Sequence, residues 1–351
     1  MNKDFFSKHI INWYRSHQRD LPWRRTRDPY KIWLSEIILQ QTRVAQGLPY
    51  YEKFVKKFPS VFELAKASTQ DVLRLWQGLG YYSRARNLHQ CAKDIVQRYN
   101  GVFPNSFEEL KKLKGIGPYT AAAIASIAFR EPVAVVDGNV FRVLARVFGV
   151  DKDIASDEGK KYFFSLANDL IDRTQPDLFN QAMMEFGALH CLPRNPKCDE
   201  CIFSKKCEAK SRNLQELLPV KSKKLKVRTR YLNYFVILAK NKVLMRQRNG
   251  KDIWKGLYDF YLIETSRSQK AETLIQKDKF LGRSRVVRES KMITHLLSHQ
   301  KLKVKFIDIE KTFSKQAELA LKKMGLKSFT QKQISRLPKP ILIDRFLQSN
   351  P

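Results

Sequence analysis

The sequence lacks any apolar run that approaches the roughly 20 residues of a membrane-spanning helix. Its first residues, Met1 to Phe6, also lack the apolar core of a secretory signal peptide. Acidic residues are scarce: 34 Asp or Glu stand against 66 Lys or Arg, a formal net charge of +32. We therefore expect a cytoplasmic protein whose partner is a polyanion, most simply nucleic acid.

Cysteine is also rare. Four of the five cysteines lie close together, in the pattern Cys191-x6-Cys198-x2-Cys201-x5-Cys207. A reducing cytoplasm disfavours disulfides, so four neighbouring thiols predict a metal site. Zinc sites favour two C-x2-C pairs, and only one pair here has that spacing. The residues alone leave zinc and an iron–sulfur cluster open, and we interpret the distant Cys91 as a core thiol.

A glycine-rich turn joins two predicted helices, Phe107–Lys112 and Tyr119–Phe129. Gly115 and Gly117 leave backbone N–H groups uncovered, and Pro118 suits the first turn of the second helix. Uncovered N–H groups at the positive end of a helix dipole bind anions. Because lysines surround the turn, we predict that it contacts a DNA phosphate.

Asp137 follows an apolar run and precedes a further predicted helix. In that position an aspartate caps the helix N-terminus, and for an isolated Asp-Gly-Asn capping alone is the simpler interpretation. The nearby glycine turn favours a second, functional role for this carboxylate.

Glu36 lies on a predicted helix, within Tyr30–Tyr50, that is apolar around most of its circumference. Gln40 and Arg43 fall on the same side at helical spacing. Burial of a glutamate costs free energy, so such a residue is expected either to pair with a cation or to have a function in catalysis or binding. The residues leave two alternatives: a salt bridge to Arg43, or an acid whose pKa burial raises toward neutrality.

The pattern changes near residue 214. Residues 1–213 are mostly helical by pattern, and residues 214–229 form a basic linker. From residue 230, strand-like runs appear between helices, so residues 230–351 are predicted to form an α+β domain. The predicted strands of this domain are Tyr231–Ala239, Lys242–Arg248, Tyr258–Ile263 and Lys301–Ile309, and its predicted helices are Phe313–Met324 and Lys339–Gln348. Residues 1–213 are predicted to begin with the helix Phe5–His17.

Several ordered motifs together resemble the adenine DNA glycosylases of the MutY type, members of the helix-hairpin-helix, endonuclease III-like superfamily. These motifs are Trp33-Leu34-Ser35-Glu36, Trp76 to Leu88, Gly115-Ile116-Gly117, Val136-Asp137-Gly138-Asn139 and the four-cysteine loop at residues 191–207. The resemblance implies a mostly α glycosylase domain with an iron–sulfur loop, followed by a Nudix-like domain. That second domain shows no Glu-rich Nudix box, so we assign it no pyrophosphatase chemistry.

The resemblance also implies roles for individual residues. Glu36 would protonate adenine N7, Asp137 would stabilise the cationic sugar, and Tyr119 stands where lyase-competent relatives have a lysine nucleophile. One 4Fe-4S cluster would be held by Cys191, Cys198, Cys201 and Cys207. Arg24 and Asn139 would line the adenine pocket or hold Asp137. The other implied DNA contacts are Gln41, Leu79 and Tyr81 as wedges, Gly115 and Gly117 on phosphate, and Ser298 and His299 on 8-oxoguanine.

The implied substrate is double-stranded DNA of the bacterial nucleoid in which adenine is mispaired with 8-oxoguanine or guanine. The resemblance further implies a monomer that flips the adenine out of the duplex. Two alternatives remain from the sequence. One is an endonuclease III-like glycosylase and lyase for oxidised pyrimidines, and the other is a non-catalytic DNA-binding module.

Overall fold

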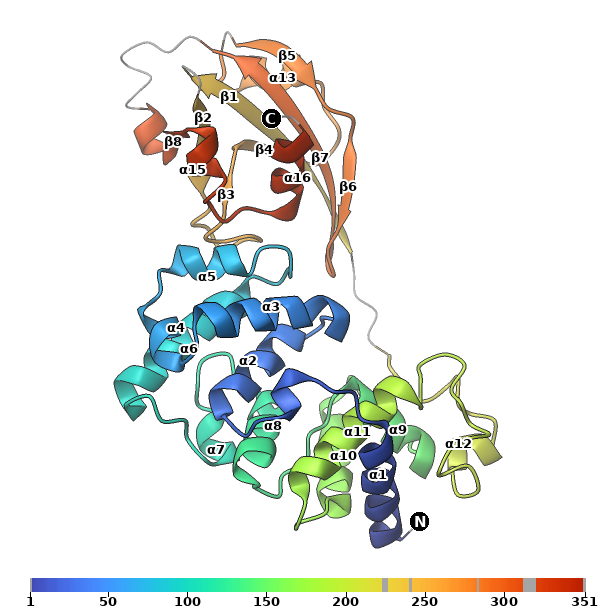
Figure 1. Ribbon diagram of the computed structural model, residues 1–351. Coiled ribbons are helices and arrows are strands. Elements are labelled where there is room, and N and C mark those ends of the chain that lie inside the picture. Colours follow the sequence, from blue (N-terminus) through green and yellow to red (C-terminus); the bar gives the residue numbers. More distant parts are fainter. Residues whose placement is uncertain (1, 223–226, 240–241, 283, 312–319, 350–351) are drawn as a thin grey trace. The chain divides into compact units, whose positions relative to one another are not determined.

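The structure is a computed structural model that describes residues 2–222, 227–239, 242–282, 284–311 and 320–349 (Figure 1). It divides into two compact units, one of residues 1–66 with 87–223 and the other of residues 67–86 with 224–351. The second unit therefore includes a short piece from the middle of the helical region. The division at residues 213 and 229 stays a prediction, and linker residues 223–226 lie outside the described residues.

The first unit is helical. The predicted helices Phe5–His17, Phe107–Lys112 and Tyr119–Phe129 are confirmed, with boundaries shifted by one or two residues at several ends. Its elements are α1 (Lys3–His17), η1 (Pro22–Arg24), α2 (Pro29–Leu39), α3 (Val44–Lys57), α4 (Val61–Lys66), most of α6 (Ser83–Tyr99), α7 (Phe107–Leu110), α8 (Pro118–Phe129), α9 (Gly138–Phe148), α10 (Asp157–Leu170), α11 (Pro176–Leu189) and α12 (Glu208–Ser211).

Helix α11 lies at the centre of this unit, in contact with α1, α8 and α9, while α2 packs on α8 and α3. Large aromatic side chains fill the space between these helices. Phe186 of α11 meets the ring of Trp13 edge-on at 4.9 Å and the ring of Phe203 at 5.6 Å. Burial of such side chains supplies most of the free energy that orders the helices.

The predicted helix through Tyr30–Tyr50 is wrong as a single element. Helix α2 ends at Leu39 and α3 begins at Val44, because Gln41 adopts the left-handed backbone conformation with φ +54°. Arg43 is the residue that precedes α3. Arg43 therefore does not lie on the same helix as Glu36, two turns further on. No ion pair between these two side chains occurs among the described residues.

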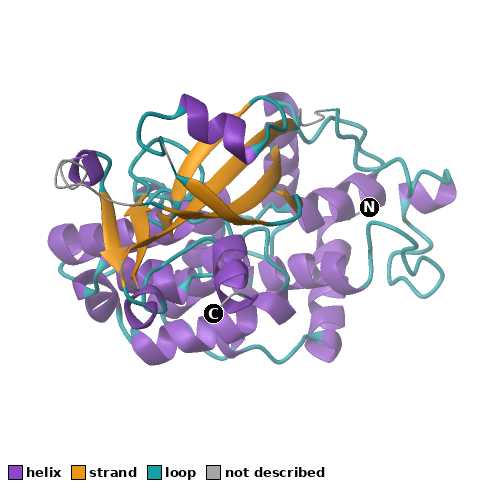
Figure 2. Ribbon diagram, turned by 90° about the horizontal axis from the view of Figure 1, so that it is seen from above, coloured by secondary structure: helices purple, strands orange, loops and turns teal. Residues whose placement is uncertain are grey.

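The second unit is built on one mixed sheet (Figure 2). Strand β1 pairs in parallel with β7, from Arg228 opposite Gln300 to Leu238 opposite Glu310, and antiparallel with β2 and β4. The elements are α5 (Thr69–Leu75), β1 (Arg228–Ala239), β2 (Lys242–Gln247), β3 (Tyr258–Asp259), β4 (Tyr261–Thr265), α13 (Ala271–Lys277), β5 (Arg285–Glu289), β6 (Ile293–Leu296), β7 (Gln300–Glu310), β8 (Leu326–Phe329), α15 (Gln331–Ile334) and α16 (Ile341–Ser349).

Alternate residues of β1 point to opposite faces of this sheet. Phe235 packs with Leu274 of α13 in one buried cluster. On the other face Tyr234 stacks on Phe306, which in turn stacks on Phe346 of α16 at 4.1 Å. Helices thus cover both faces of the sheet, and both of its apolar surfaces are buried.

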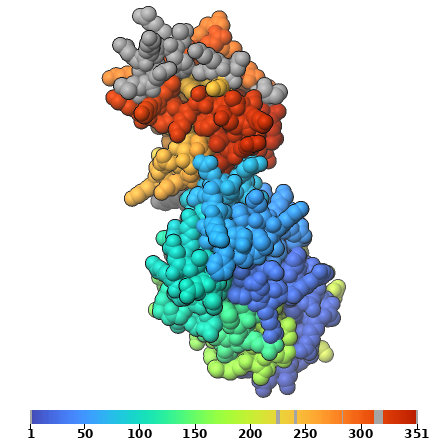
Figure 3. Space-filling model, turned by 60° about the vertical axis from the view of Figure 1, so that its left-hand side comes forward, coloured from blue at the N-terminus to red at the C-terminus, as the bar shows by residue number. Residues whose placement is uncertain are grey.

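Two further contacts complete the second unit. The backbone N–H of Tyr258 donates to the carbonyl of Pro338 at 2.8 Å, so residues near the C-terminus lie beside the loop that precedes β3 (Figure 3). Lys339 N–H donates to the side chain of Gln77 at 3.1 Å, which holds residues 67–86 in this unit.

The four predicted strands are confirmed as strand-forming segments, except that Tyr258–Ile263 splits into β3 and β4 at Phe260. The predicted number is wrong, because the sheet also contains β5, β6 and β8. Most of the predicted helix Phe313–Met324 lies outside the described residues, which resume at residue 320. Within the part of the chain that the structure describes, no helix is both long and apolar enough to cross a lipid bilayer.

Candidate active site

Glu36 is a buried carboxyl group on α2, with 8 % of its surface exposed. Burial raises its pKa to about 7, a hydrogen bond from Tyr119 and the charge of Arg24 lower it, and the neighbouring Asp137 carboxylate raises it. Near neutral pH this group therefore exists in both protonation states. That is the property a general acid needs.

Tyr119 stands in the first turn of α8 and faces this carboxyl group. Its hydroxyl donates to Oε2 of Glu36 at 2.7 Å and lies 3.4 Å from the sulfur of Met184 in α11. Helix α8 is held to the end of α2 by a second contact, in which Gln40 donates to Oγ1 of Thr120 at 3.2 Å. Tyr119 thus holds the Glu36 side chain, and Thr120 holds the C-terminal end of the helix that carries it.

Asp137 caps α9 and also lies near Glu36. Its Oδ1 accepts the backbone N–H groups of Asn139 and Val140 at 2.8 Å each, and its Oδ2 accepts the side chain of Asn139 at 2.8 Å. Burial raises the pKa of Asp137, and these hydrogen bonds lower it. Asp137 is therefore a true N-cap of α9, and its half-buried carboxylate lies close enough to Glu36 to raise the pKa of that group.

Asn139 is itself held in place. Its Oδ1 accepts a hydrogen bond from Arg142 at 2.9 Å, and Arg142 also donates to the carbonyl of Gly187 at 2.7 Å. A Cβ on Gly187 would lie 2.5 Å from the Cβ of Asn139, so glycine is needed where α11 crosses the start of α9. The sequence placed Asn139 near Asp137, and the structure shows the bond that joins them.

Glu185 was missed from the sequence. This residue of α11 has a side chain that is 1 % exposed, and it forms paired hydrogen bonds with both Arg24 and Arg19 at 2.6 to 2.9 Å. Burial raises its pKa, but the two guanidinium groups outweigh that effect and bring it to about 2. Arg24 is therefore anchored by Glu185 rather than by Asp137, and its charge acts on Glu36 from that position.

The glycine turn has the predicted form. Gly115 has φ +81°, and Gly117 precedes α8, whose first residue is Pro118. Lys114 is exposed and forms no ion pair with a described carboxylate, whereas Lys111 and Lys112 pair with Glu108 and Glu109. These features suit a phosphate, although two of the three lysines are already partly neutralised.

The three predicted wedge residues differ in exposure. Gln41 is exposed at the break between α2 and α3, and Tyr81 is 44 % exposed with φ +46°. Leu79 is buried, with 6 % of its surface exposed. In this structure only Gln41 and Tyr81 are available at the surface to contact DNA.

A cavity of about 480 Å³ lies within the second unit. Residues 80–83 and 86, 252–254 and 296–300 line it, so it includes Tyr81, Ser298 and His299. The hydroxyls of Tyr81 and Ser298 are hydrogen-bonded to each other, and both side chains are exposed. The structure thus brings together two residues that lie 217 positions apart in the sequence.

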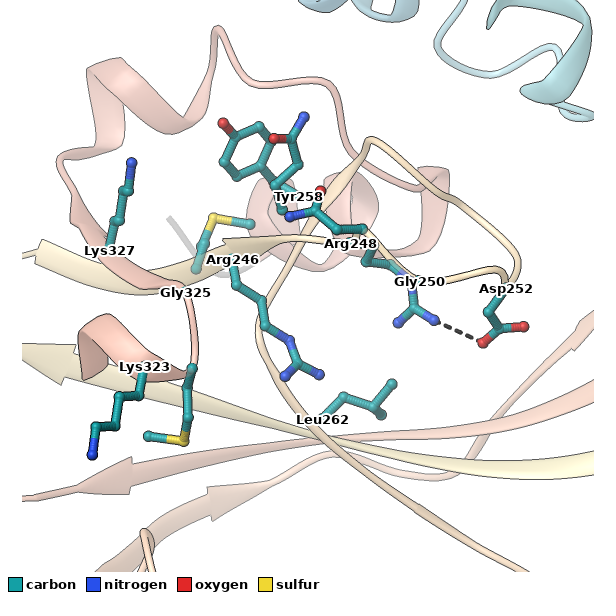
Figure 4. Close-up of a pocket in the computed structure, with 13 residues that line it drawn as sticks. Arg246, Arg248, Gly250, Asp252, Tyr258, Leu262, Lys323, Gly325 and Lys327 are labelled. Atoms are coloured by element: carbon teal, nitrogen blue, oxygen red, sulfur yellow. Dashed lines mark hydrogen bonds and ion pairs between the residues drawn. The ribbon is translucent and has the colours of Figure 1, made fainter. Parts of the chain in front are cut away.

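A second cavity of the same unit, about 570 Å³, lies beside β2 (Figure 4). Arg246 points into it, while Arg248 turns toward Asp252 at 2.8 Å and also donates to the buried Asp259 at 2.6 Å. Asp252 is the carboxylate among its lining residues, and it is already paired. We assign no hydrolytic chemistry to this cavity.

The four clustered thiols lie on the loop between α11 and α12. Burial raises the pKa of Cys201 to about 12, and the thiols of Cys191, Cys207 and Cys198 lie near enough to raise it as well. Arg146 donates to the sulfur of Cys191 at 3.5 Å. Within the described ranges, no three Cys, His, Asp or Glu side chains are close enough to bind one metal ion.

Comparison with known proteins agrees with both halves of the fold. Residues 34–168 match the HhH-GPD superfamily of base excision DNA repair proteins, and residues 233–349 match the NUDIX domain. The solved structure of a thermostable thymine-DNA glycosylase covers 60 % of this chain and 97 % of its own, with 31 % identity and a TM-score of 0.55. An endonuclease III–DNA complex, 21 % identical with a TM-score of 0.53, shares the helical fold.

Curated relatives are more specific. The adenine DNA glycosylase of Buchnera aphidicola (subsp. Baizongia pistaciae) is 40 % identical over 261 residues, which cover 73 % of each chain. The human adenine DNA glycosylase is 44 % identical over 222 residues, 61 % of this chain and 41 % of the human protein. The chain therefore belongs to the family of adenine DNA glycosylases.

Proposed function

We propose that this protein removes adenine mispaired with 8-oxoguanine, or with guanine, from double-stranded DNA, acting as a monomer on nucleoid DNA. One observation carries the proposal: a buried glutamate with a pKa of about 7 receives a hydrogen bond from Tyr119 and lies beside a second carboxylate, Asp137. The relatives supply the substrate class through their names.

The two acids suit cleavage of an N-glycosidic bond. With adenine extruded from the duplex, protonated Glu36 would give its proton to N7, and the C1′–N9 bond would break with its electron pair moving to the base. The sugar would then carry positive charge, which the Asp137 carboxylate would stabilise. Water would add at C1′, and the proton it releases would return to Glu36.

Tyr119 supports hydrolysis without strand cleavage. A lyase needs an amine that forms a Schiff base with the sugar, and a phenol cannot form one. Burial and the neighbouring carboxylates raise the pKa of Tyr119 well above its ordinary value, so the hydroxyl stays protonated. This favours a monofunctional glycosylase over the endonuclease III-like alternative.

The cavity at residues 80–83, 86, 252–254 and 296–300 would receive the base opposite adenine. Tyr81 would wedge into the stack, and Ser298 and His299 would contact 8-oxoguanine. Gln41 would support the separated strand, while Gly115 and Gly117 would bind phosphate. Arg24 would line the adenine pocket from its anchored position on Glu185.

Cys191, Cys198, Cys201 and Cys207 would hold a 4Fe-4S cluster, a group that four thiolates commonly bind. When bound it would tie the loop into one rigid body. Arg146 already fixes this loop by donating to the carbonyls of Leu192 and Pro193 at 2.6 and 3.0 Å. Iron and sulfide analysis of the purified protein, with loss of visible absorbance in Cys198→Ser, tests the assignment; zinc in a colourless protein would refute it.

The Glu36→Gln variant tests the main proposal. We expect wild-type protein to produce alkali-dependent strand breaks at adenine opposite 8-oxoguanine, and the variant to lose at least about 100-fold in rate while still binding the duplex. Single-turnover kinetics and a binding titration on the same oligonucleotides measure both quantities. The exposed Glu52→Gln serves as the matched control and should keep the wild-type rate.

Other outcomes would identify the alternatives. Breaks without alkali at thymine glycol would mark an endonuclease III-like lyase. Binding without cleavage of any duplex would mark a non-catalytic module. Substantial excision by Glu36→Gln would remove Glu36 from the acid role.

A further inference from the structure

Arg230 of β1 is a buried cation whose hydrogen-bonding capacity is fully used. Its side chain is 8 % exposed. It donates twice to Glu264, at 2.7 and 2.5 Å, twice to Asp252, at 2.8 and 2.7 Å, and once to Oε1 of Gln300, at 3.0 Å. A guanidinium has five N–H groups fixed in one plane, so each of them has a partner here.

These partners come from three separate segments of the second unit. Glu264 lies on β4, next to Arg230's own strand. Asp252 belongs to the loop between β2 and β3, and Gln300 is the first residue of β7, directly after Leu297–His299. Asp252 and Gln300 both line the cavity that contains Tyr81 and Ser298, whereas Arg230 is not among its lining residues. Arg230 thus links the two segments that line the cavity, at Asp252 and at Gln300, without lining the cavity itself.

The wall that follows Asp252 is conformationally strained. Trp254 has φ +61° and is 8 % exposed. A bulky residue in the left-handed region persists only where its surroundings impose that conformation. Here the loop is held by the Asp252–Arg230 pair, by the N–H of Leu257 donating to Trp254 at 3.0 Å, and by Arg86 donating to the carbonyl of Lys255 at 2.8 Å.

Stability alone is a weak reason for such a network. The free energy lost when two charges leave water offsets much of the attraction between them in a buried ion pair. Apolar residues of similar size therefore often stabilise a protein equally well. A planar five-donor hub instead fixes angles and distances between the groups that it joins. The hydrogen bonds from Arg230 lower the pKa of Asp252 and of Glu264, which keeps both partners charged at neutral pH.

We propose that Arg230 is a positioning residue for recognition of the base opposite adenine. By fixing Asp252 and Gln300 it sets the spacing between the Trp254 wall and the Leu297–His299 loop, and this spacing distinguishes 8-oxoguanine from guanine. The inference rests on the proposed function of this cavity.

Two variants that leave the cavity lining unchanged test this role. Arg230→Lys keeps the charge but cannot form paired hydrogen bonds to two carboxylates, and Glu264→Gln places an amide where the guanidinium needs an acceptor. The measured quantity is the ratio of excision rates for adenine opposite 8-oxoguanine and opposite guanine. We expect that ratio to fall at least about tenfold in Arg230→Lys, since displacements near 1 Å have effects up to about 100-fold.

A second readout separates positioning from loss of structure. Dissociation constants are measured for both duplexes with an uncleavable adenine analogue. The ratio of the constant for the guanine duplex to that for the 8-oxoguanine duplex should fall together with the ratio of excision rates, while the thermal unfolding midpoint shows a folded protein. Arg285→Lys is the matched control, because Arg285 pairs with Glu310 on the surface with 77 % of its side chain exposed. It should keep the wild-type ratio.

The outcomes are distinguishable. A wild-type protein with no preference for 8-oxoguanine would refute the proposed function of the cavity. A wild-type preference that folded Arg230→Lys retains in full would overturn the positioning role and leave the proposed function standing. If Arg230→Lys does not fold, Glu264→Gln decides between the same two results.

Discussion

At the scale of single residues, the protonation of Glu36 controls the proposed chemistry. Burial is the largest influence on its pKa, and it disfavours the carboxylate because a charge loses hydration in the protein interior. The group therefore donates a proton below a pH of about 7 and loses that ability as the pH rises through that value. Asp137 sets the lower pH limit of excision, since its carboxyl group must be ionised to stabilise the cationic sugar.

Tyr119→Phe should move the alkaline limb of the pH profile upward. The Tyr119 hydroxyl lowers the pKa of Glu36 by donating to its carboxylate at 2.7 Å. Without that bond the protonated form persists to higher pH, by about 1 pH unit for a hydrogen bond to a charged group. Single-turnover excision rates between pH 5 and 9 would measure the midpoint, whatever the change in absolute rate.

A surface tyrosine provides the comparison. Tyr162 is 41 % exposed, and Tyr162→Phe should leave the midpoint where the wild type has it. A midpoint that stays fixed or moves downward in Tyr119→Phe would contradict the hydrogen-bond assignment.

Sequence patterns identified some of these residues and missed others. Asp137 and Asn139 follow local rules, because a cap and its neighbours are close in sequence. Glu185 gives no such signal. Its partners Arg19 and Arg24 lie 166 and 161 positions away, and only the packing of α11 beside η1 brings the three charges together.

At the scale of elements, the turn before α8 depends on the backbone of Gly115. A Cβ at this position would lie 2.7 Å from the Cβ of Asn87, and the φ of +81° disfavours any other residue. Gly115→Ala should therefore destabilise the helical unit by about 1–3 kcal/mol and weaken duplex binding. Chemical denaturation followed by far-ultraviolet circular dichroism, together with a binding titration, would measure both effects.

Gly117 offers a control in the same turn. Its φ is −90°, and a Cβ there meets no atom within 4 Å. Gly117→Ala should keep the wild-type stability. Equal loss in both variants would show that the turn responds to any added side chain rather than to the conformation of Gly115.

Helices with local signals were predicted well, and elements shaped by distant contacts were not. Pro118, the glycines and the capping residues mark α8 and α9 directly. The break between α2 and α3 has no glycine or proline signal at Gln41, so the apolar pattern suggested one continuous helix. Strands β5, β6 and β8 were not predicted, because few of their residues are buried and they show no apolar alternation.

At the scale of the whole molecule, the order of the sequence hides the composition of the second unit. Residues 67–86 belong to it through contacts such as Gln70 with Tyr258, at 3.1 Å, and Lys339 with Gln77. A boundary read from composition falls where the chain changes from helical to strand-like patterns. It cannot show that an earlier segment completes the later domain, because nothing local to residues 67–86 records their partners.

The net charge of +32 predicts how binding responds to salt. Lysines and arginines on phosphates release counterions, so duplex affinity should fall linearly with salt on logarithmic axes. A duplex with 8-oxoguanine and one with guanine carry the same phosphate charge. The preference between them should therefore stay constant while both affinities fall, as titrations from 50 to 200 mM salt would show.

Lys114→Ala makes this test specific to the glycine turn. Lys114 is exposed beside Gly115, without an ion pair to a described carboxylate, and removing one phosphate contact should reduce the magnitude of the salt slope by about 1. Lys152, which pairs with Glu158, is the comparison, and its alanine variant should keep the wild-type slope. An unchanged slope in Lys114→Ala would remove the turn from the phosphate contacts. A base preference that disappears with salt would mean that charge, rather than the shape of the cavity, selects the base opposite adenine.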